Sequence, residues 1–329
     1  MILKTICNDN GMYETQKKER LRAMKTVQTV TGEAPISQLG HCQMHEHLFV
    51  AEGPATRKNP ALLVDERERS LAELEIYRRA GGGSCLDAQP GGAGRDARVL
   101  REISWRSGVA LIAVTGYHLP HFYAPTHWLF SASRSALTDF FIDELRNGCV
   151  ENREVRPGAV KAAVGPEGLV GAAAERYRAA AEAAARAEVP LVVHTEKGLD
   201  GVRAVELACA CGMPIHRVLI CHADRQAADF APHEAIADTG AMLEYDTIGR
   251  FKYHDDEAEC RLILHMLERG HERQLLFSLD TTRERLSTYG GAIGLNYILD
   301  VFLPMLAASG ISEQTLRRIT VDNPARVFE

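Results

Sequence analysis

Short apolar runs alternate with longer amphipathic stretches along most of the chain. From residue 45 onward, the pattern repeats eight times as an apolar run, a polar loop and a helix-like segment. Residues 175–188 and 256–270 are two of the helix-like segments. Apolar strands that alternate with helices indicate a parallel sheet covered by helices. The eight apolar runs are residues 45–50, 82–88, 108–116, 158–165, 189–195, 217–223, 241–247 and 275–280.

Eight strand–helix units predict a single α/β domain folded as a closed (β/α)8 TIM barrel, with its active site at the C-terminal ends of the strands. The alternative is an open, doubly wound sheet. Such sheets often carry a glycine-rich dinucleotide fingerprint between a strand and a helix, and we find none. The glycine-rich segment 90–96 lacks that spacing, and a phosphate-loop lysine is absent.

The first residues differ from the rest of the chain. Residues 1–23 are polar and charged and show no apolar periodicity, whereas an alternating strand pattern follows Met24. We therefore expect a flexible extension over residues 1–23 and one (β/α)8 barrel domain over residues 24–329. The extension lacks the apolar core of a signal peptide, and no apolar stretch is long enough to span a bilayer. The expected location is the cytoplasm.

The overall charge narrows the class of partner. The 329 residues carry a formal net charge of −6. This balance argues against a general nucleic-acid binder and against binding to a membrane surface. We expect a small-molecule partner.

Residues that can bind metals stand within or at the ends of five apolar runs. His45 and His47 are two residues apart, so on a strand both point to one side while Glu46 points outward toward the helices. A helical pair of His41 and His45 is the rival arrangement, but the apolar residues after His47 favour a strand. The remaining members of the set are Lys161, His194, His222 and Asp280.

Buried polar groups of this kind are costly unless they share a partner. A divalent metal centre is such a partner. Imidazole and carboxylate groups suit Zn²⁺, with Mn²⁺, Co²⁺ and Fe²⁺ as alternatives.

Lys161 is the unusual member of the set, because an ammonium group cannot bind a cation. Burial beside metal ions lowers the pKa of a lysine, first through desolvation and then through the like charge. The neutral amine can add CO₂ to form a carbamate, N6-carboxylysine, which can bridge two metal ions. The alternative is a structural lysine that reaches the rim of the barrel.

The pattern of strand-end residues resembles the amidohydrolase superfamily. A His-x-His pair lies on the first strand, Lys161 on the fourth, histidines on the fifth and sixth, and Asp280 on the eighth. The segments MHEHLFV, KAAVG, HTEKG, CHAD and SLDTTR are similar to those of its phosphotriesterase family, and the resemblance covers about residues 24–329. It implies two divalent metal ions bridged by carbamylated Lys161 and a hydroxide, and it suggests a homodimer.

The resemblance also implies a role for each ligand. His45, His47 and Asp280 would hold the more buried ion, and His194 and His222 the more exposed one. The bridging hydroxide would attack the substrate, and Asp280 would accept its proton and pass it to the leaving group.

Substrate choice in a barrel enzyme depends on the loops after the strands. Here the loops after the last two runs carry four cations, which suit a phosphate or carboxylate on the substrate. The chain is similar to family members that act on phosphorylated furanose lactones, because Lys252 and Arg283 match their loop-seven lysine and loop-eight arginine. A tyrosine of that branch is replaced by Leu286, with Tyr289 close by. The expected substrate residues are Lys252, Arg283, Arg285, Tyr289, Tyr117 and Asp224.

We therefore expect a metal-dependent hydrolase of ester bonds, and first a lactonase of phosphorylated sugar lactones. An aryl dialkyl phosphate triesterase and an acyl-homoserine lactonase are the alternatives within this class. A mononuclear, deaminase-like enzyme is a further alternative, but such an enzyme does not need the lysine that stands on the fourth strand, Lys161. A catalytically weak barrel that binds a small ligand is the alternative of another class.

Overall fold

The computed structural model describes residues 25–196, 198 and 200–329, so the expected extension over residues 1–23 lies outside the described residues. Eight strands form one sheet, in which each strand pairs in parallel with the next one along the chain. The strands are β3 (His41–Glu46), β4 (Gly82–Asp87), β5 (Ala110–Gly116), β6 (Ala159–Ala163), β7 (Leu191–His194), β8 (Val218–Cys221), β9 (Met242–Tyr245) and β10 (Leu275–Phe277).

The last strand returns to the first and closes the sheet. The backbone N–H of Asp280, just after β10, donates to the carbonyl of His45 on β3 at 3.1 Å. The N–H of His45 donates in turn to Oγ of Ser278 at 3.0 Å. The predicted (β/α)8 barrel is therefore confirmed.

The first strand starts earlier than its apolar run suggested. It begins at His41 and ends at Glu46, so His47 lies one residue beyond it. The start of β3 could not be recognised as an apolar run, because its residues include polar ones whose partners come from distant parts of the chain. His41 Nδ1, for example, lies 2.9 Å from the hydroxyl of Tyr77 in the buried wall, and burial lowers the pKa of His41 to about 4. His41 is thus a structural residue.

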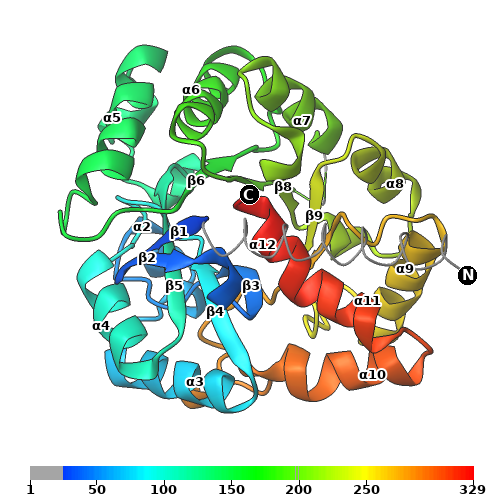
Figure 1. Ribbon diagram of the computed structural model, residues 1–329. Coiled ribbons are helices and arrows are strands. Elements are labelled where there is room, and N and C mark those ends of the chain that lie inside the picture. Colours follow the sequence, from blue (N-terminus) through cyan, green and yellow to red (C-terminus); the bar gives the residue numbers. More distant parts are fainter. Residues whose placement is uncertain (1–24, 197, 199) are drawn as a thin grey trace, which may run out of the picture.

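The helices surround the strands, as Figure 1 shows. The alanines of α6 are good helix formers, and their small side chains allow one face of this helix to be buried against the barrel. The helices are α2 (Pro54–Lys58), α3 (Arg67–Arg79), α4 (Ala97–Ser107), α5 (Arg134–Asn147), α6 (Gly171–Ala187), α7 (Gly201–Ala210), α8 (Ala231–Asp238), α9 (Asp256–Glu268), α10 (Leu303–Ala308), α11 (Glu313–Arg317) and α12 (Asn323–Val327).

The N-terminal end of the barrel is filled with apolar side chains. Strands β1 (Thr26–Thr29) and β2 (Gly32–Pro35) form an antiparallel hairpin, which lies with α12 across this end (Figure 1). Val27 and Phe328 pack there in one buried cluster with residues of the strand interiors. Burial of each such aliphatic or aromatic side chain contributes roughly 1.5–3 kcal/mol. The filled end leaves the opposite, C-terminal end of the strands for a site.

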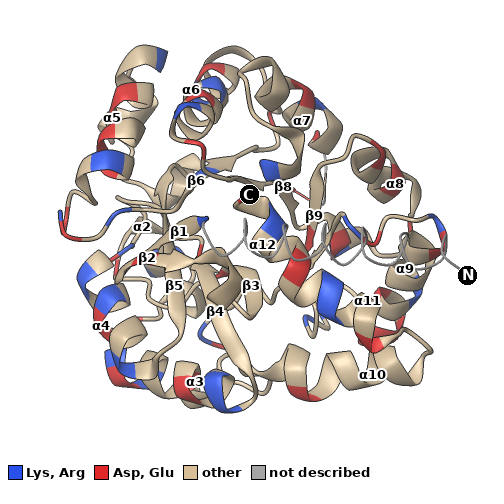
Figure 2. Ribbon diagram, in the orientation of Figure 1, with Lys and Arg blue, Asp and Glu red and all other residues tan. Residues whose placement is uncertain are grey.

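The outer helices carry interspersed acidic and basic residues (Figure 2). Several of these charges pair across neighbouring helices, as Arg67 of α3 does with Glu102 of α4 at 2.9 Å. None of the helices in the described part of the chain is both long and apolar enough to cross a membrane.

Candidate active site

The six metal-binding candidates lie together at the C-terminal ends of the strands. The ligand atoms of His45, His222 and Asp280 all lie within 4.8 Å of one another. The other three candidates adjoin them: Lys161 Nζ is 3.0 Å from His45 Nε2, His194 Nδ1 is 2.8 Å from His222 Nε2, and His47 Nε2 is 3.3 Å from Asp280 Oδ1. The structure thus brings together side chains from five strands.

Two of the candidates have an unusual backbone. His222 has a φ of +65° and Asp280 a φ of +47°, in the left-handed region that residues with a Cβ rarely adopt. Such a conformation costs on the order of 1–3 kcal/mol and persists only where the surrounding structure holds it. Glu46 contributes to this support, because its carboxylate accepts hydrogen bonds from the N–H groups of Leu279 and Thr281, on either side of Asp280.

Asp246, which follows β9, is a central residue that the sequence reasoning did not single out. Its Oδ1 accepts a hydrogen bond from His222 Nδ1 at 2.7 Å, and its Oδ2 accepts one from His45 Nδ1 at 2.8 Å. Burial acts to raise the pKa of Asp246, but the two imidazoles outweigh it and hold the pKa well below its usual range. A lone carboxylate directly after an apolar strand was the available signal, as it was for Asp280.

These hydrogen bonds fix the tautomers of the imidazoles. Because His222 donates through Nδ1, its Nε2 presents a lone pair toward His194 Nδ1. Nε2 of His194 lies 3.3 Å from Glu196 Oε1, and when it donates to this oxygen, Nδ1 of the same ring presents a second lone pair. Two lone pairs that face each other at 2.8 Å repel unless a cation or a proton lies with them.

The same donor set suits transition-metal ions. His45 Nε2 also presents a lone pair to the centre, because its Nδ1 donates to Asp246. Nδ1 of His47 is buried without a hydrogen-bond partner among the described residues. Imidazole nitrogens held from behind by carboxylates, together with the Asp280 carboxylate, could hold divalent ions such as Zn²⁺.

Lys161 lies wholly inside the barrel, and burial lowers the pKa of its amine. Its backbone position depends on Gly116 at the end of β5. Gly116 has a φ of +109°, and a Cβ built on it would lie 1.9 Å from the carbonyl oxygen of Lys161. The same carbonyl accepts a hydrogen bond from the N–H of Tyr117 at 3.0 Å. Glycine at this position therefore lets β5 and β6 approach closely enough to place Lys161 in the centre.

A cavity of about 190 Å³ opens over these side chains. Phe122 and His118 form part of its wall, with their rings stacked at a centroid distance of 3.7 Å. Burial, followed by the neighbouring His194 and Lys161, lowers the pKa of His118 well below its usual range. The cationic side chains that line the cavity are Arg225, Arg250 and Lys252.

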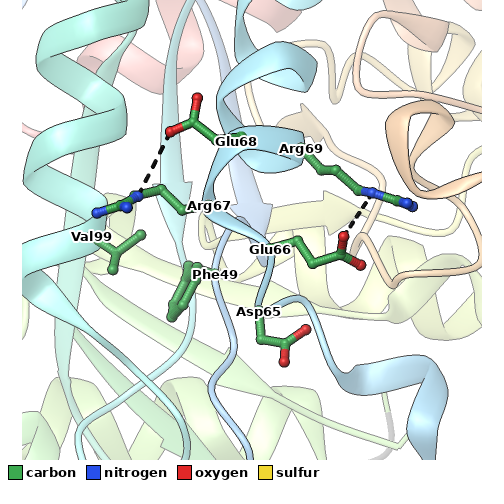
Figure 3. Close-up of a pocket in the computed structure, with 7 residues that line it drawn as sticks. All are labelled: Phe49, Asp65, Glu66, Arg67, Glu68, Arg69 and Val99. Carbon is green, nitrogen blue, oxygen red and sulfur yellow. Dashed lines mark ion pairs between the residues drawn. The ribbon is translucent and has the colours of Figure 1, made fainter.

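A larger depression of about 450 Å³ lies elsewhere, lined by Phe49, Val99 and the charged residues 65–69 (Figure 3). Four of its charges form two ion pairs, Arg69 with Glu66 at 2.8 Å and Arg67 with Glu68 at 3.8 Å. None of the six metal-binding candidates lines it. The cavity at the strand ends is therefore the candidate active site.

Arg283 does not line that cavity. Its guanidinium group donates to Glu66 at 2.5 Å and to the carbonyl of Leu63 at 3.1 Å, and it lies 3.4 Å from Asp65. Its backbone N–H is tied to the carbonyl of Ala61 at 2.8 Å. These partners direct Arg283 toward the loop before α3 and away from the metal-binding candidates.

Four other substrate candidates also lie outside the cavity lining. Tyr289 shares hydrogen bonds with Ser70 and the loop before α3, and Arg285 donates to the carbonyl of Ile248. Burial lowers the pKa of Arg285 to about 10. Asp224 accepts a hydrogen bond from the N–H of Thr247 at 2.6 Å, and Tyr117 is buried behind the wall. Of the six predicted substrate residues, Lys252 alone lines the cavity.

The fold and the strand-end residues define the class of protein as a barrel hydrolase. Residues 25–328 match the model of the Phosphotriesterase family, and the chain belongs to this family, whose members are binuclear metal hydrolases. It is 26% identical to the Phospho-furanose lactonase of Mycoplasmopsis synoviae, over 92% of each chain. It is 26% identical to the N-acetyltaurine hydrolase of Salmo salar, over 91% of this chain and 97% of that one. The crystal structure of a lactonase from Listeria monocytogenes superposes with a TM-score of 0.86 at 26% identity, covering 92% of this chain and 99% of that one.

Proposed function

We propose that the protein is a binuclear metal-dependent lactonase whose substrate carries an acidic group, with phosphorylated sugar lactones as the first substrate class. The observation that carries the proposal is the convergence of ligand atoms from His45, His222 and Asp280 within 4.8 Å of one another, with His194 Nδ1 2.8 Å from His222 Nε2. Relatives named Phospho-furanose lactonase, and the lactonase of known structure, support the reaction class.

In this proposal His45, His47 and Asp280 hold one ion, and His194 and His222 hold the other. Lys161, carbamylated by CO₂, would be a further ligand. When bound, two divalent ions lower the pKa of a shared water, so that hydroxide exists at neutral pH, and they polarise the scissile carbonyl. Zn²⁺ fits the imidazole-rich donor set, and Mn²⁺, Co²⁺ and Fe²⁺ share its preferences.

The protein's own groups orient the reaction and move the proton. Asp246 fixes the rings of His45 and His222, and Glu196 supports His194. Asp280 faces His47 through Oδ1, and its carboxylate accepts the proton of the attacking water and passes it to the alkoxide of the opened lactone. Proton transfer of this kind typically contributes a factor of about 10²–10⁴ to the rate.

The cavity lining distinguishes among substrates. A phosphotriester is neutral and gains little from cations, whereas Arg225, Arg250 and Lys252 favour an anion. The names Phospho-furanose lactonase and N-acetyltaurine hydrolase both denote compounds with an acidic group. The acidic amide is therefore the second substrate class to test.

The test is a hydrolysis screen on metal-loaded protein. The panel contains phosphorylated sugar lactones, their unphosphorylated counterparts, an acyl-homoserine lactone, N-acetyltaurine and an aryl dialkyl phosphate. We expect the highest kcat/KM for a phosphorylated lactone, loss of activity after chelation, and recovery when Zn²⁺ is returned. Activity that survives complete chelation, or a preference for the neutral triester, would contradict the proposal.

A further inference from the structure

We propose that His118 is a catalytic hydrogen-bond donor, whose Nε2–H group stabilises the negative charge that develops on the carbonyl oxygen of the substrate. The inference rests on the proposed function and deepens it by assigning this role to a residue of the loop after β5. His118 lines the cavity, yet it belongs neither to the six metal-binding candidates nor to the cationic side chains of the wall.

The backbone of this loop decides which ring nitrogen of His118 carries the proton. The N–H of Leu119 donates to Nδ1 of His118 at 2.7 Å. A backbone N–H can only donate, so Nδ1 accepts and carries no proton. The proton of the ring is therefore on Nε2. In this state Nε2 can donate a hydrogen bond but cannot act as a base.

Nε2 of His118 is available to a ligand. It has no hydrogen-bond partner among the described residues. Unlike Nδ1 of His47, it is also not sealed from solvent. Most polar groups in the interior of a protein are paired, so an unpaired donor in the wall of a cavity indicates a partner that comes with the ligand.

The ring of His118 is held in place before any ligand arrives. It stacks on Phe122 with a centroid distance of 3.7 Å and an interplanar angle of 18°. The backbone N–H of His118 donates to the hydroxyl of Tyr123 at 3.0 Å, and that of Phe122 donates to the carbonyl of Leu119 at 3.0 Å. A donor fixed in this way stabilises developing charge without reorganisation during the reaction.

The placement of His118 complements that of Asp280. The ring of His118 lies beside His194, with a centroid distance of 4.7 Å. Asp280 adjoins a different ligand, since its Oδ1 lies 3.3 Å from Nε2 of His47. A carbonyl group bound between them can turn its oxygen toward His118 while water attacks from the side of Asp280.

The proposed step transfers no proton through His118. The water oxygen bonds to the carbonyl carbon, its proton goes to Asp280, and the π electron pair of the carbonyl moves onto the carbonyl oxygen. The Nε2–H group of His118 donates a hydrogen bond to that oxygen. When the C=O bond re-forms, the ring C–O bond breaks, and the released oxygen takes the proton from Asp280.

Two variants separate this role from a structural one. In His118→Asn, the amide oxygen can still accept the N–H of Leu119, but the distant donor is lost. In His118→Gln, the amide N–H group replaces the distant donor, whereas the acceptor for Leu119 is lost. His121→Gln is the matched control, because His121 is exposed in the same loop and does not line the cavity.

The first measurement is binding without turnover. Isothermal calorimetry on the zinc-loaded protein uses methylphosphonate, a tetrahedral anion that resembles the adduct. His118→Asn should weaken its binding about tenfold or more, the loss expected for a hydrogen bond to a charged group. His118→Gln should stay within about threefold of the wild type and His121→Gln within about twofold. The cationic residues are unchanged in all three variants, so the differences report the donor.

The second measurement is turnover of the best substrate from the hydrolysis screen. His118→Asn should lower kcat about 100-fold with little change in KM, because the hydrogen bond strengthens only as charge develops. His118→Gln should recover most of this loss. If no compound in the panel is hydrolysed, the proposed function fails, and the order of affinities for methylphosphonate still decides the role of His118.

The inference is overturned if His118→Asn binds methylphosphonate as the wild type does, or if His118→Gln loses as much as His118→Asn. Nuclear magnetic resonance of the ¹⁵N-labelled, zinc-loaded wild type reads the tautomer directly and does not depend on how the variants fold. We expect a protonated Nε2 and an unprotonated Nδ1 in His118. The opposite tautomer would also overturn the inference.

Discussion

Asp246 accepts a hydrogen bond from Nδ1 of His222 at 2.7 Å and thereby fixes which ring nitrogen of His222 faces the centre of the site. The other oxygen of the same carboxylate does this for His45 at 2.8 Å. One buried residue therefore orients ligands that we assign to two different metal ions. The arrangement makes Asp246 a positioning residue whose effect should appear in metal binding.

Replacing Asp246 with Asn should weaken metal binding about 10- to 100-fold, the effect usual for the hydrogen-bond partner of a ligating histidine. The amide offers only one acceptor oxygen, so it cannot hold both rings in their present tautomers. Competition titration with a chromogenic chelator measures the affinity. Asp139→Asn, on the exposed surface of α5, is the control. Equal affinities for the two variants would show that Asp246 does not position the ligands.

Lys161 should require CO₂ to complete the site, because a free amine cannot bridge two cations. Metal-free protein given Zn²⁺ in CO₂-depleted buffer should recover activity slowly, and bicarbonate should accelerate the recovery several-fold. Lys161→Ala should hold fewer metal ions and lose activity in either buffer. Full and equally fast recovery without bicarbonate would rule out the carbamate.

Gly116→Ala should destabilise the protein by about 2 kcal/mol or more, because the new Cβ would lie 1.9 Å from the Lys161 carbonyl. Gly81→Ala is a matched control, since Gly81 has a similar φ of +107° and nothing within 4 Å of a built Cβ. The difference between the two unfolding free energies, measured in urea, isolates the clash from the backbone strain. Equal losses would show that the approach of β5 to β6 can relax.

His41 should make the protein less stable in mild acid. Burial lowers its pKa to about 4 from an ordinary 6.5, so the unfolded chain binds more protons than the folded one between these values. The stability contributed by the neutral ring is complete above pH 6.5 and falls as the pH drops toward 4. Between pH 7 and 4.5 the wild type should lose about 2 kcal/mol more than His41→Asn does. The unfolding free energy of each protein is measured in urea at both pH values. Equal losses in the two proteins would contradict this assignment.

Much of the barrel follows from local pattern, because each buried parallel strand is a continuous apolar run. The start of β3 could not be predicted in this way, since polar residues such as His41 acquire their partners only when the chain folds. The six metal-binding candidates were visible because each is a polar residue at an apolar strand end. Asp246 also follows an apolar strand, but its role could not be predicted, because it depends on hydrogen bonds with two histidines from other strands.

The substrate residues were the least predictable part of the site. Arg283 has the spacing of a substrate contact, yet Glu66, more than 200 positions earlier in the chain, takes its guanidinium group. Arg225, which does line the cavity, lies three residues after His222 and has no spacing that marks it as a substrate contact. Sequence spacing places a charged residue on a loop, but the direction of a long side chain is set by whichever carboxylate packs beside it.

The strand-end histidines, Lys161 and Asp280 should together hold two metal ions, and metal stoichiometry tests this directly. Protein reconstituted with Zn²⁺ and bicarbonate, then freed of unbound metal, would be analysed by inductively coupled plasma mass spectrometry together with a His194→Ala, His222→Ala double variant. We predict two ions per chain in the wild type and at most one in the variant. One ion or none in the wild type, or no difference between the two proteins, would contradict it.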